Sequence, residues 1–160
     1  MRFVSQRWVP HPMQRVLAQY FDLEHSRYVH PHTLGESRLV TCHGKVVWFE
    51  QRWPRRFGLG VRLRSFVKME LTAPNQARFH VVKGLGRGSQ LDVVLDERDG
   101  QTSVDETYDV PLRLHPWLER MVQRWLAKKV DEVWEEDLRV GLPHGGWPGI
   151  PRDPRPGNCP

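Results

Sequence analysis

Residues 59 to 71 alternate between apolar and polar side chains, and this pattern constrains the fold more than any other feature of the sequence. The apolar or small side chains of the stretch are Val61, Leu63, Ser65, Val67, Met69 and Leu71. Charged side chains fill most of the positions between them. Because successive side chains of a strand point to opposite faces, the stretch is predicted to belong to a sheet with one buried face and one solvated face.

Period-two patterns recur along most of the chain, separated by turn signals such as His43-Gly44 and Asp99-Gly100. They predict seven strands, at residues 3–9, 36–42, 45–53, 59–71, 77–83, 89–97 and 102–110. Helical spacing of apolar residues predicts two short helices, at 13–20 and 22–30, between the first two strands. It also predicts a long helix over residues 115–138, after the last strand.

Strands grouped together, with helices at either end of the run, are typical of an α+β domain. We expect a curved seven-stranded antiparallel sheet around the long C-terminal helix. The two short helices would then fill the gap after the first strand. The side chains that form the apolar stripe of the long helix are Leu118, Val122, Trp125, Leu126, Val130 and Val133. A cavity between this stripe and the sheet would suit an apolar ligand.

The composition limits the classes of function. The net charge is +5, but the arginines are spread along the strands, so we expect no nucleic-acid partner. No apolar run is long enough to cross a bilayer, and the N-terminus lacks the apolar core of a secretory signal. We therefore expect a cytoplasmic protein without a membrane span. We assign residues 1–140 to one domain and residues 141–160 to a Pro/Gly-rich tail.

The two cysteines, Cys42 and Cys159, belong to neither a CxxC nor a CxH pattern. This excludes an iron–sulfur cluster or a structural zinc site built on cysteine within the chain. Two cysteines do not make a disulfide framework, and we expect free thiols.

The stretch most suggestive of chemistry is DLEHSRYVHPHTLG, residues 22–35, which holds three of the chain's eight histidines. Within it runs Asp22-x2-His25-x4-His30, which offers two imidazoles to a metal ion. A turn broken at Pro31 would allow the two histidines to converge. Two interpretations remain open: a metal site at the mouth of a cavity, or a histidine-rich connection between a helix and a strand.

The sequence resembles the SRPBCC superfamily, whose helix-grip fold is shared by START-like lipid-transfer domains, birch-pollen-allergen proteins and polyketide cyclases. The resemblance covers roughly residues 1–140. It rests on the order of elements, on the PxPxxRV opening before the first helix, and on the long helix ending in WEEDLRV. It implies a pocket for a hydrophobic small molecule of lipid, aromatic or polyketide type.

The segment 22–35 also resembles the mononuclear-iron motif of Rieske oxygenase catalytic domains, including the HPxTLG that follows the second histidine. By position, His25 and His30 would be the imidazole ligands of Fe(II), and Asp22 would orient them. The carboxylate ligand would be Asp137, with Glu136 as the substitute. Those oxygenases carry a Rieske domain with a Cys-x-His and Cys-x2-His cluster, which this chain lacks. Iron chemistry here would need an electron-donor protein.

Three functional hypotheses follow. The first is the binding of a hydrophobic small molecule between the sheet and the long helix, with Trp125, Val133 and Phe49 as ligand-binding residues. The second is an enzyme resembling the mononuclear non-haem iron oxygenases, without a Rieske domain of its own. The third is a partner protein that docks onto an oxidoreductase or another subunit through its basic face and Pro-rich tail.

Overall fold

A computed structural model describes residues 1–23, 25–30, 32–54, 62–112 and 114–140 of the chain. The helices and strands follow in the order β1 (Arg2–Val9), α1 (Met13–Phe21), α2 (His25–Val29), β2 (Glu36–His43), β3 (Val46–Arg52), β4 (Arg64–Ala73), β5 (Gln76–Gly84), β6 (Gln90–Arg98), β7 (Gln101–Asp109) and α3 (Pro116–Val140). This is the order of elements that the sequence predicts. Part of the predicted strand 59–71 and the whole predicted tail lie outside the described residues.

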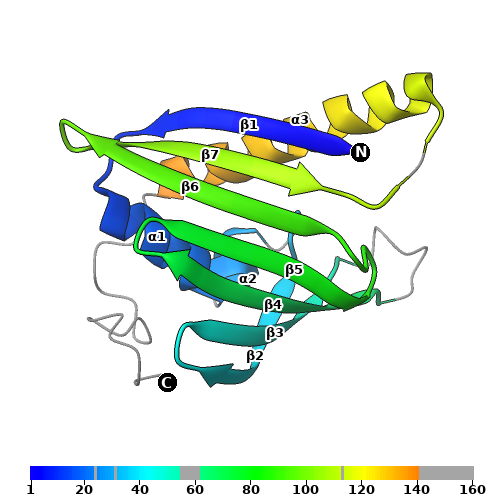
Figure 1. Cartoon of the computed structure of the whole chain (residues 1–160), viewed down its shortest axis with the longest axis horizontal. Helices are drawn as coiled ribbons and strands as arrows, with labels where there is room; N and C mark the ends of the chain where they lie inside the picture. The colour runs from blue at the N-terminus through cyan, green and yellow to red at the C-terminus, as the bar shows by residue number, and fades with distance from the viewer. Residues whose placement is uncertain (24, 31, 55–61, 113, 141–160) are drawn as a thin grey trace.

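The strands form one antiparallel sheet in the order β1-β7-β6-β5-β4-β3-β2. The first strand joins the last one, with Arg2 opposite Asp109 and Val9 opposite Thr102. Figure 1 shows the helices behind the curved sheet, on one of its faces. There α1 lies against β6 and β7, α2 against β2, and α3 against β1. The seven-stranded helix-grip fold predicted from the sequence is therefore confirmed.

The alternation along each strand divides buried from exposed side chains. In β4, Ser65, Val67 and Met69 face the helices and are buried, as predicted. Two apolar clusters form the core. One joins β6 and β7 to α1 and Trp134 of α3. The other joins β3 and β4 to the connection between α1 and α2, which places the start of α2 beside the core.

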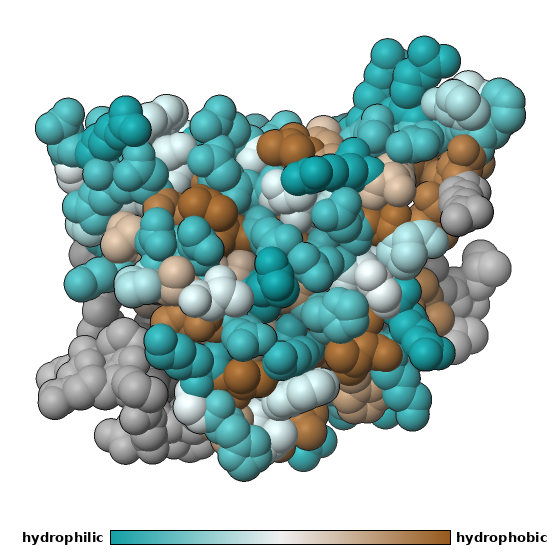
Figure 2. All heavy atoms as spheres, in the orientation of Figure 1, coloured by the Kyte–Doolittle hydropathy of each residue, from teal (hydrophilic) through white to brown (hydrophobic). Residues whose placement is uncertain are grey.

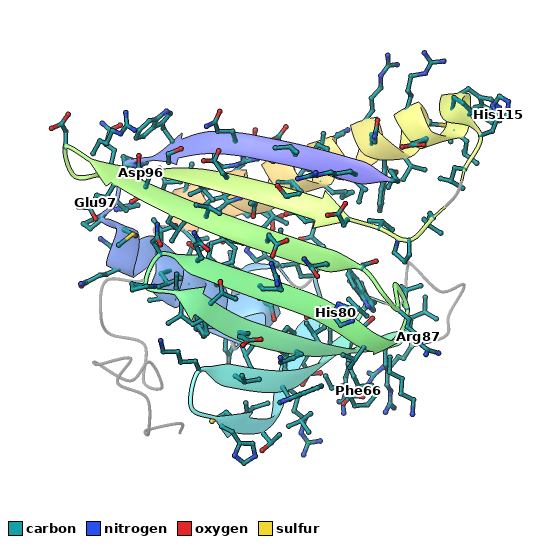
Figure 3. The ribbon with its side chains drawn as sticks, viewed as in Figure 1. Phe66, His80, Arg87, Asp96, Glu97 and His115 are labelled. Atoms are coloured by element: carbon teal, nitrogen blue, oxygen red, sulfur yellow. The ribbon has the colours of Figure 1, made fainter. Side chains whose placement is uncertain are left out.

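The opposite face of the sheet carries no helix among the described residues, and Figure 2 shows mostly hydrophilic side chains on it. Figure 3 shows Phe66 and His80 among its side chains. Its charges form pairs, with Lys68 Nζ 2.7 Å from Glu70 and Arg78 Nε 2.6 Å from Asp92. Exposed pairs of this kind contribute little to stability. The face accounts for many of the charges that the sequence predicted on solvated strand faces.

The long helix meets the core differently from the predicted stripe. Its buried side chains are Trp134 and Asp137, near its C-terminal end. Trp125, expected on the inner stripe, is 46% exposed. Figure 1 shows that the first turns of α3 extend past the ends of β1 and β7, so only the later turns have the sheet beside them. Helical periodicity predicts which face of a helix is apolar. It does not predict which part of the helix's length lies against the sheet.

Two further expectations are resolved in the described residues. Cys42 is disulfide-bonded, so the expectation of a free thiol there was wrong. Sequence spacing could not show this, because a disulfide depends on two Cα atoms lying within about 7 Å of each other. Across the part of the chain that the structure describes, no helix is both long enough and apolar enough to span a membrane.

Candidate metal centre

The motif Asp22-x2-His25-x4-His30 folds into a short helix with one capped end. Oδ1 of Asp22 accepts a hydrogen bond from the backbone N–H of His25 at 3.1 Å, which satisfies a donor that the helix itself cannot pair. At the other end, the N–H of His30 donates to the carbonyl of Ser26 at 3.2 Å. Both histidines are buried. Asp22 thus caps the helix that carries His25, and its role in orienting the imidazoles stays a prediction.

The turn that follows closes on the carbonyl oxygen of His30. The N–H groups of Leu34 and Gly35 both donate to that oxygen at 2.9 Å. Gly35 has φ of +81°, and a Cβ there would lie 2.3 Å from the carbonyl oxygen of Arg52. Only glycine fits both conditions without strain. This glycine therefore lets the turn after His30 pack closely against the end of β3.

A row of polar side chains fastens α2 to the sheet. Ser26 Oγ donates to Ser37 Oγ on β2 at 3.0 Å, and Ser37 Oγ donates to Oε1 of Gln51 on β3 at 2.6 Å. Nε2 of Gln51 in turn donates to the carbonyl of Leu34. These contacts join the helix, the turn and two strands, and so hold the two histidines in fixed positions.

The third component comes from the last turns of α3. Oδ1 of Asp137 lies 2.6 Å from Nε2 of His25 and 2.6 Å from Nε2 of His30. Asp137 is 2% exposed and His30 is 1% exposed. Potential ligand atoms of the three residues all lie within 4.8 Å of one another. The structure thus brings together the three residues that the resemblance implied as metal ligands.

Glu136, the substitute carboxylate, does not point at the same place. Its Oε2 lies 2.6 Å from Nδ1 of His30, on the opposite side of that ring, and accepts a hydrogen bond from Thr33 Oγ1 at 3.2 Å. Consecutive residues of an α-helix point about 100° apart, which separates the two carboxylates. Between them they contact both nitrogens of His30.

The cluster alters the pKa values of its members. Burial by itself disfavours a charged His30, but its hydrogen bonds to Asp137 and Glu136 outweigh this and raise the pKa of His30. Burial works to raise the pKa of Asp137, yet the hydrogen bonds from His25 and His30 lower it below its usual range. Both ring nitrogens of His30 can donate only when the ring is protonated. The cluster therefore stabilises positive charge next to Asp137.

The donor set also fits a divalent metal ion. Two imidazole nitrogens and one carboxylate oxygen are the ligands of the facial triad of non-haem iron sites. Bonds from an ion to an imidazole nitrogen or a carboxylate oxygen are about 2.0–2.2 Å long, whereas two such atoms on one ion lie somewhat farther than 2.6 Å apart. The present contacts of 2.6 Å would have to open only slightly. In addition, the buried Nδ1 of His25 has no hydrogen-bond partner among the described residues, so that ring is not committed elsewhere.

The predicted ligand-binding residues lie in different surroundings. Phe49 is buried in the cluster with Val67 and Met69, whereas Val133 is half-buried on α3 and Trp125 is largely exposed. The described residues also line a shallow hollow, at the β6–β7 turn beside Trp8, which is away from the predicted cavity between the sheet and α3. A ligand-binding role for Phe49, Val133 and Trp125 stays a prediction.

A second buried acid lies beneath the same helix, and sequence reasoning gave it no role. Glu106 of β7 accepts hydrogen bonds from Tyr20 Oη at 2.8 Å and from Trp134 Nε1 at 3.4 Å. Burial raises the pKa of Glu106 and, with the nearby carboxylate, raises that of Tyr20. The sequence feature that could have indicated this buried acid is an acidic residue on the apolar face of a predicted strand.

Two further histidines lie away from the cluster. His80 lies on the outer face of the sheet, and His115 lies at the start of α3 (Figure 3).

No protein-family profile matches the sequence, and no curated protein matches it. Several solved structures, however, match its fold. TTHA0849 from Thermus thermophilus superimposes with a TM-score of 0.67 at 19% identity, covering 85% of this chain and 93% of that one. A START superfamily protein from Mycobacterium smegmatis gives a TM-score of 0.67 at 11% identity, over 84% and 94% of the two chains. The Zhui aromatase/cyclase from Streptomyces sp. R1128 gives 0.65 at 12% identity, over 88% and 96%.

At these identities the likeness concerns the fold. The curved antiparallel sheet and long C-terminal helix match the helix-grip architecture of START-like structures. The chain therefore has the helix-grip fold, and within it lies a buried cluster of two histidines and an aspartate.

Proposed function

We propose that this protein binds a divalent transition-metal ion, Fe(II) by its resemblance to the oxygenases, through His25, His30 and Asp137. One observation supports this above all others. Two imidazole nitrogens lie 2.6 Å from the same buried carboxylate oxygen, and the three residues come from opposite ends of the chain. Two imidazole nitrogens and a carboxylate oxygen that converge away from water also match the donor set of a metal site.

The roles of the chain's own residues follow from this arrangement. His25 and His30 offer Nε2 lone pairs, and Asp137 offers a negative charge that the buried setting leaves unscreened by water. Three protein ligands of this type would leave coordination positions of the ion available to other molecules. Fe(II), if held by these three residues, would supply redox chemistry with dioxygen. The chain has no cysteine pattern for a Rieske cluster, so its electrons would come from a separate donor protein.

The test is metal loading under anaerobic conditions. We expect wild-type protein to bind Fe(II) close to one ion per chain, and His25→Ala to lose this binding. His32→Ala is the matched control, because His32 lies in the same segment but is exposed. No bound metal in the wild type, or equal binding in the wild type and His25→Ala, would contradict the proposal.

A second candidate function, compatible with the first, is the binding of a hydrophobic small molecule. The observation that favours it is the apolar cluster of Phe49, Val67 and Met69, which packs against Leu23, close to His25 in the chain. One structure of the same fold is named as an aromatase/cyclase, the Zhui protein.

This second function is tested with a hydrophobic fluorescent probe. We expect the probe to bind and to raise the thermal midpoint of the wild type, and Phe49→Ala to change the probe's affinity. Val94→Ala, on the outer sheet face, is the control and should leave it unchanged. Failure of any hydrophobic probe to bind would count against an interior ligand site.

A further inference from the structure

The two adjacent carboxylates of α3 contact different atoms of the same imidazole ring. Asp137 faces Nε2 of His30, whereas Glu136 faces Nδ1 at 2.6 Å. The side chain of Asp137 is almost fully buried, while that of Glu136 is 27% exposed. Only Nε2 of His30 therefore faces the point on which His25 and Asp137 converge.

Thr33 holds the Glu136 carboxylate against the ring. Thr33 Oγ1 donates to the same Oε2 that contacts Nδ1 of His30. The backbone N–H of Thr33 donates to the carbonyl of His30 at 3.2 Å, so the turn that carries Thr33 is fixed to the same histidine. Glu136, Thr33 and His30 thus form a closed unit in which the acid cannot move without breaking a contact.

This contact has a consequence for the ring's tautomer. A neutral imidazole has one N–H. Without a metal ion, Glu136 at Nδ1 and Asp137 at Nε2 both lie 2.6 Å from the ring and compete for that proton. A metal ion between Nε2 and Asp137 would remove this competition, and the carboxylate of Glu136 would then hold the proton on Nδ1. Nε2 then keeps its lone pair, and Nε2 is the atom directed toward His25 and Asp137. A carboxylate partner on the far nitrogen also makes an imidazole a stronger ligand.

We propose that Glu136 is a positioning residue for the metal centre: through Nδ1 it fixes the tautomer and orientation of His30, and it is not itself a ligand. The inference rests on the proposed function. It makes the two histidines unequal, because the buried Nδ1 of His25 has no such partner among the described residues. His30 is thus the ligand whose tautomer and orientation the protein fixes.

The test compares four forms of the protein loaded with Zn(II), which suits NMR: wild type, Glu136→Ala, Glu136→Gln and Glu135→Ala. We expect Glu136→Ala to weaken zinc binding about 10- to 100-fold, in line with the loss of comparable partners in other metal sites. Glu136→Gln keeps a neutral acceptor and should lose less. Glu135→Ala, an exposed neighbour on α3, should bind zinc as the wild type does.

The imidazole ¹H–¹⁵N spectrum supplies a readout that a merely structural role would not change. In zinc-loaded wild type we expect His30 to bind through Nε2 and to keep a slowly exchanging proton on Nδ1. Glu136→Ala should lose that protection while His30 stays bound through Nε2. Thr33→Val, which removes only the hydroxyl donor to Glu136, should give a smaller change of the same kind.

The outcomes separate the two proposals. If the wild type takes up no zinc or iron, the proposed metal function fails and this inference fails with it. If zinc binds equally well to wild type and Glu136→Ala, or if His30 binds zinc through Nδ1, only the role of Glu136 is overturned. Circular dichroism of each variant shows whether a loss of binding reflects unfolding.

Discussion

Nε2 of His30 lies 2.6 Å from Oδ1 of Asp137, although 107 residues separate them in the chain. Neither side chain reaches water to any extent. A buried histidine and a buried carboxylate stabilise each other only while they stay paired or share a cation. This pair therefore links the first third of the chain to the end of its last helix, both structurally and chemically.

Replacing Asp137 tests the pair most directly. Asp137→Ala would leave two buried imidazoles without their acceptor, and breaking a buried pair of this kind costs about 3–5 kcal/mol of stability. We expect this loss in urea unfolding, together with loss of metal binding. Asp131→Ala is the control: Asp131 pairs with Arg7 on the exposed side of α3, where an ion pair is worth far less. Equal losses in the two variants would contradict the buried role of Asp137.

The metal-free protein should be most stable in mildly acidic solution. The pKa of His30 is raised on folding, so its contribution to stability is complete below its unfolded pKa of about 6.5 and is lost as pH rises through the higher folded value. The pKa of Asp137 is lowered, so its contribution is present above its unfolded pKa of about 3.9 and is lost as pH falls through the lower folded value.

Thermal unfolding of metal-free protein from pH 4 to 9 measures this profile. We expect His30→Ala to flatten its alkaline limb. Metal should reverse the trend, because an ion binds the unprotonated ring more tightly as pH rises. A wild-type midpoint that is constant from pH 6 to 9, without metal, would show that His30 has no raised pKa.

Much of the fold could be predicted because each strand obeys one simple rule. The odd positions of β4, such as Val67 and Met69, are apolar and buried, while Lys68 and Glu70 between them pair on the outer face. The sheet order followed from short turns between consecutive strands. The pairing of β1 with β7 is different, since no local signal joins residue 2 to residue 109. It could be predicted only through the resemblance to a known family.

The candidate site was predictable in part. The resemblance implied His25, His30 and Asp137, and the structure brings these three residues together. It could not assign Glu136, because two adjacent acids on a helix differ only in their angle about the helix axis. The capping contact of Asp22 could be predicted, because a carboxylate just before a short helix is a known capping signal, and the structure shows that contact with His25. The position of α3 along the sheet exposes Trp125 and buries Trp134. This position depends on tertiary packing, which the periodicity of the sequence does not predict.

The buried acid of β7 offers a third prediction. Tyr20→Phe removes the hydroxyl that donates to Glu106 at 2.8 Å. Hydrogen bonds to charged groups contribute about 1.5–3 kcal/mol, so we expect a loss of that order in chemical unfolding. The loss should shrink in a Glu106→Gln background, where the acceptor is neutral. A double-mutant cycle gives the coupling, and an additive pair would show that Tyr20 and Glu106 do not interact.

The last prediction concerns the turn behind His30. Gly35→Ala would place a Cβ 2.3 Å from the carbonyl oxygen of Arg52, at a residue whose φ is +81°. Gly44→Ala is the matched control, because Gly44 also has a positive φ, of +59°, but a Cβ there meets nothing within 4 Å. A positive φ alone costs about 1 kcal/mol for a non-glycine residue.

We therefore expect Gly44→Ala to lose about that much stability and to bind metal normally. Gly35→Ala should lose more, since the main chain of β3 cannot give way easily. It should also weaken metal binding, because the N–H of Gly35 holds the carbonyl of His30. Unfolding curves and metal titrations of the two variants distinguish these effects. Equal stability in both would mean that the turn after His30 does not need its close approach to β3, and so does not fix the histidine.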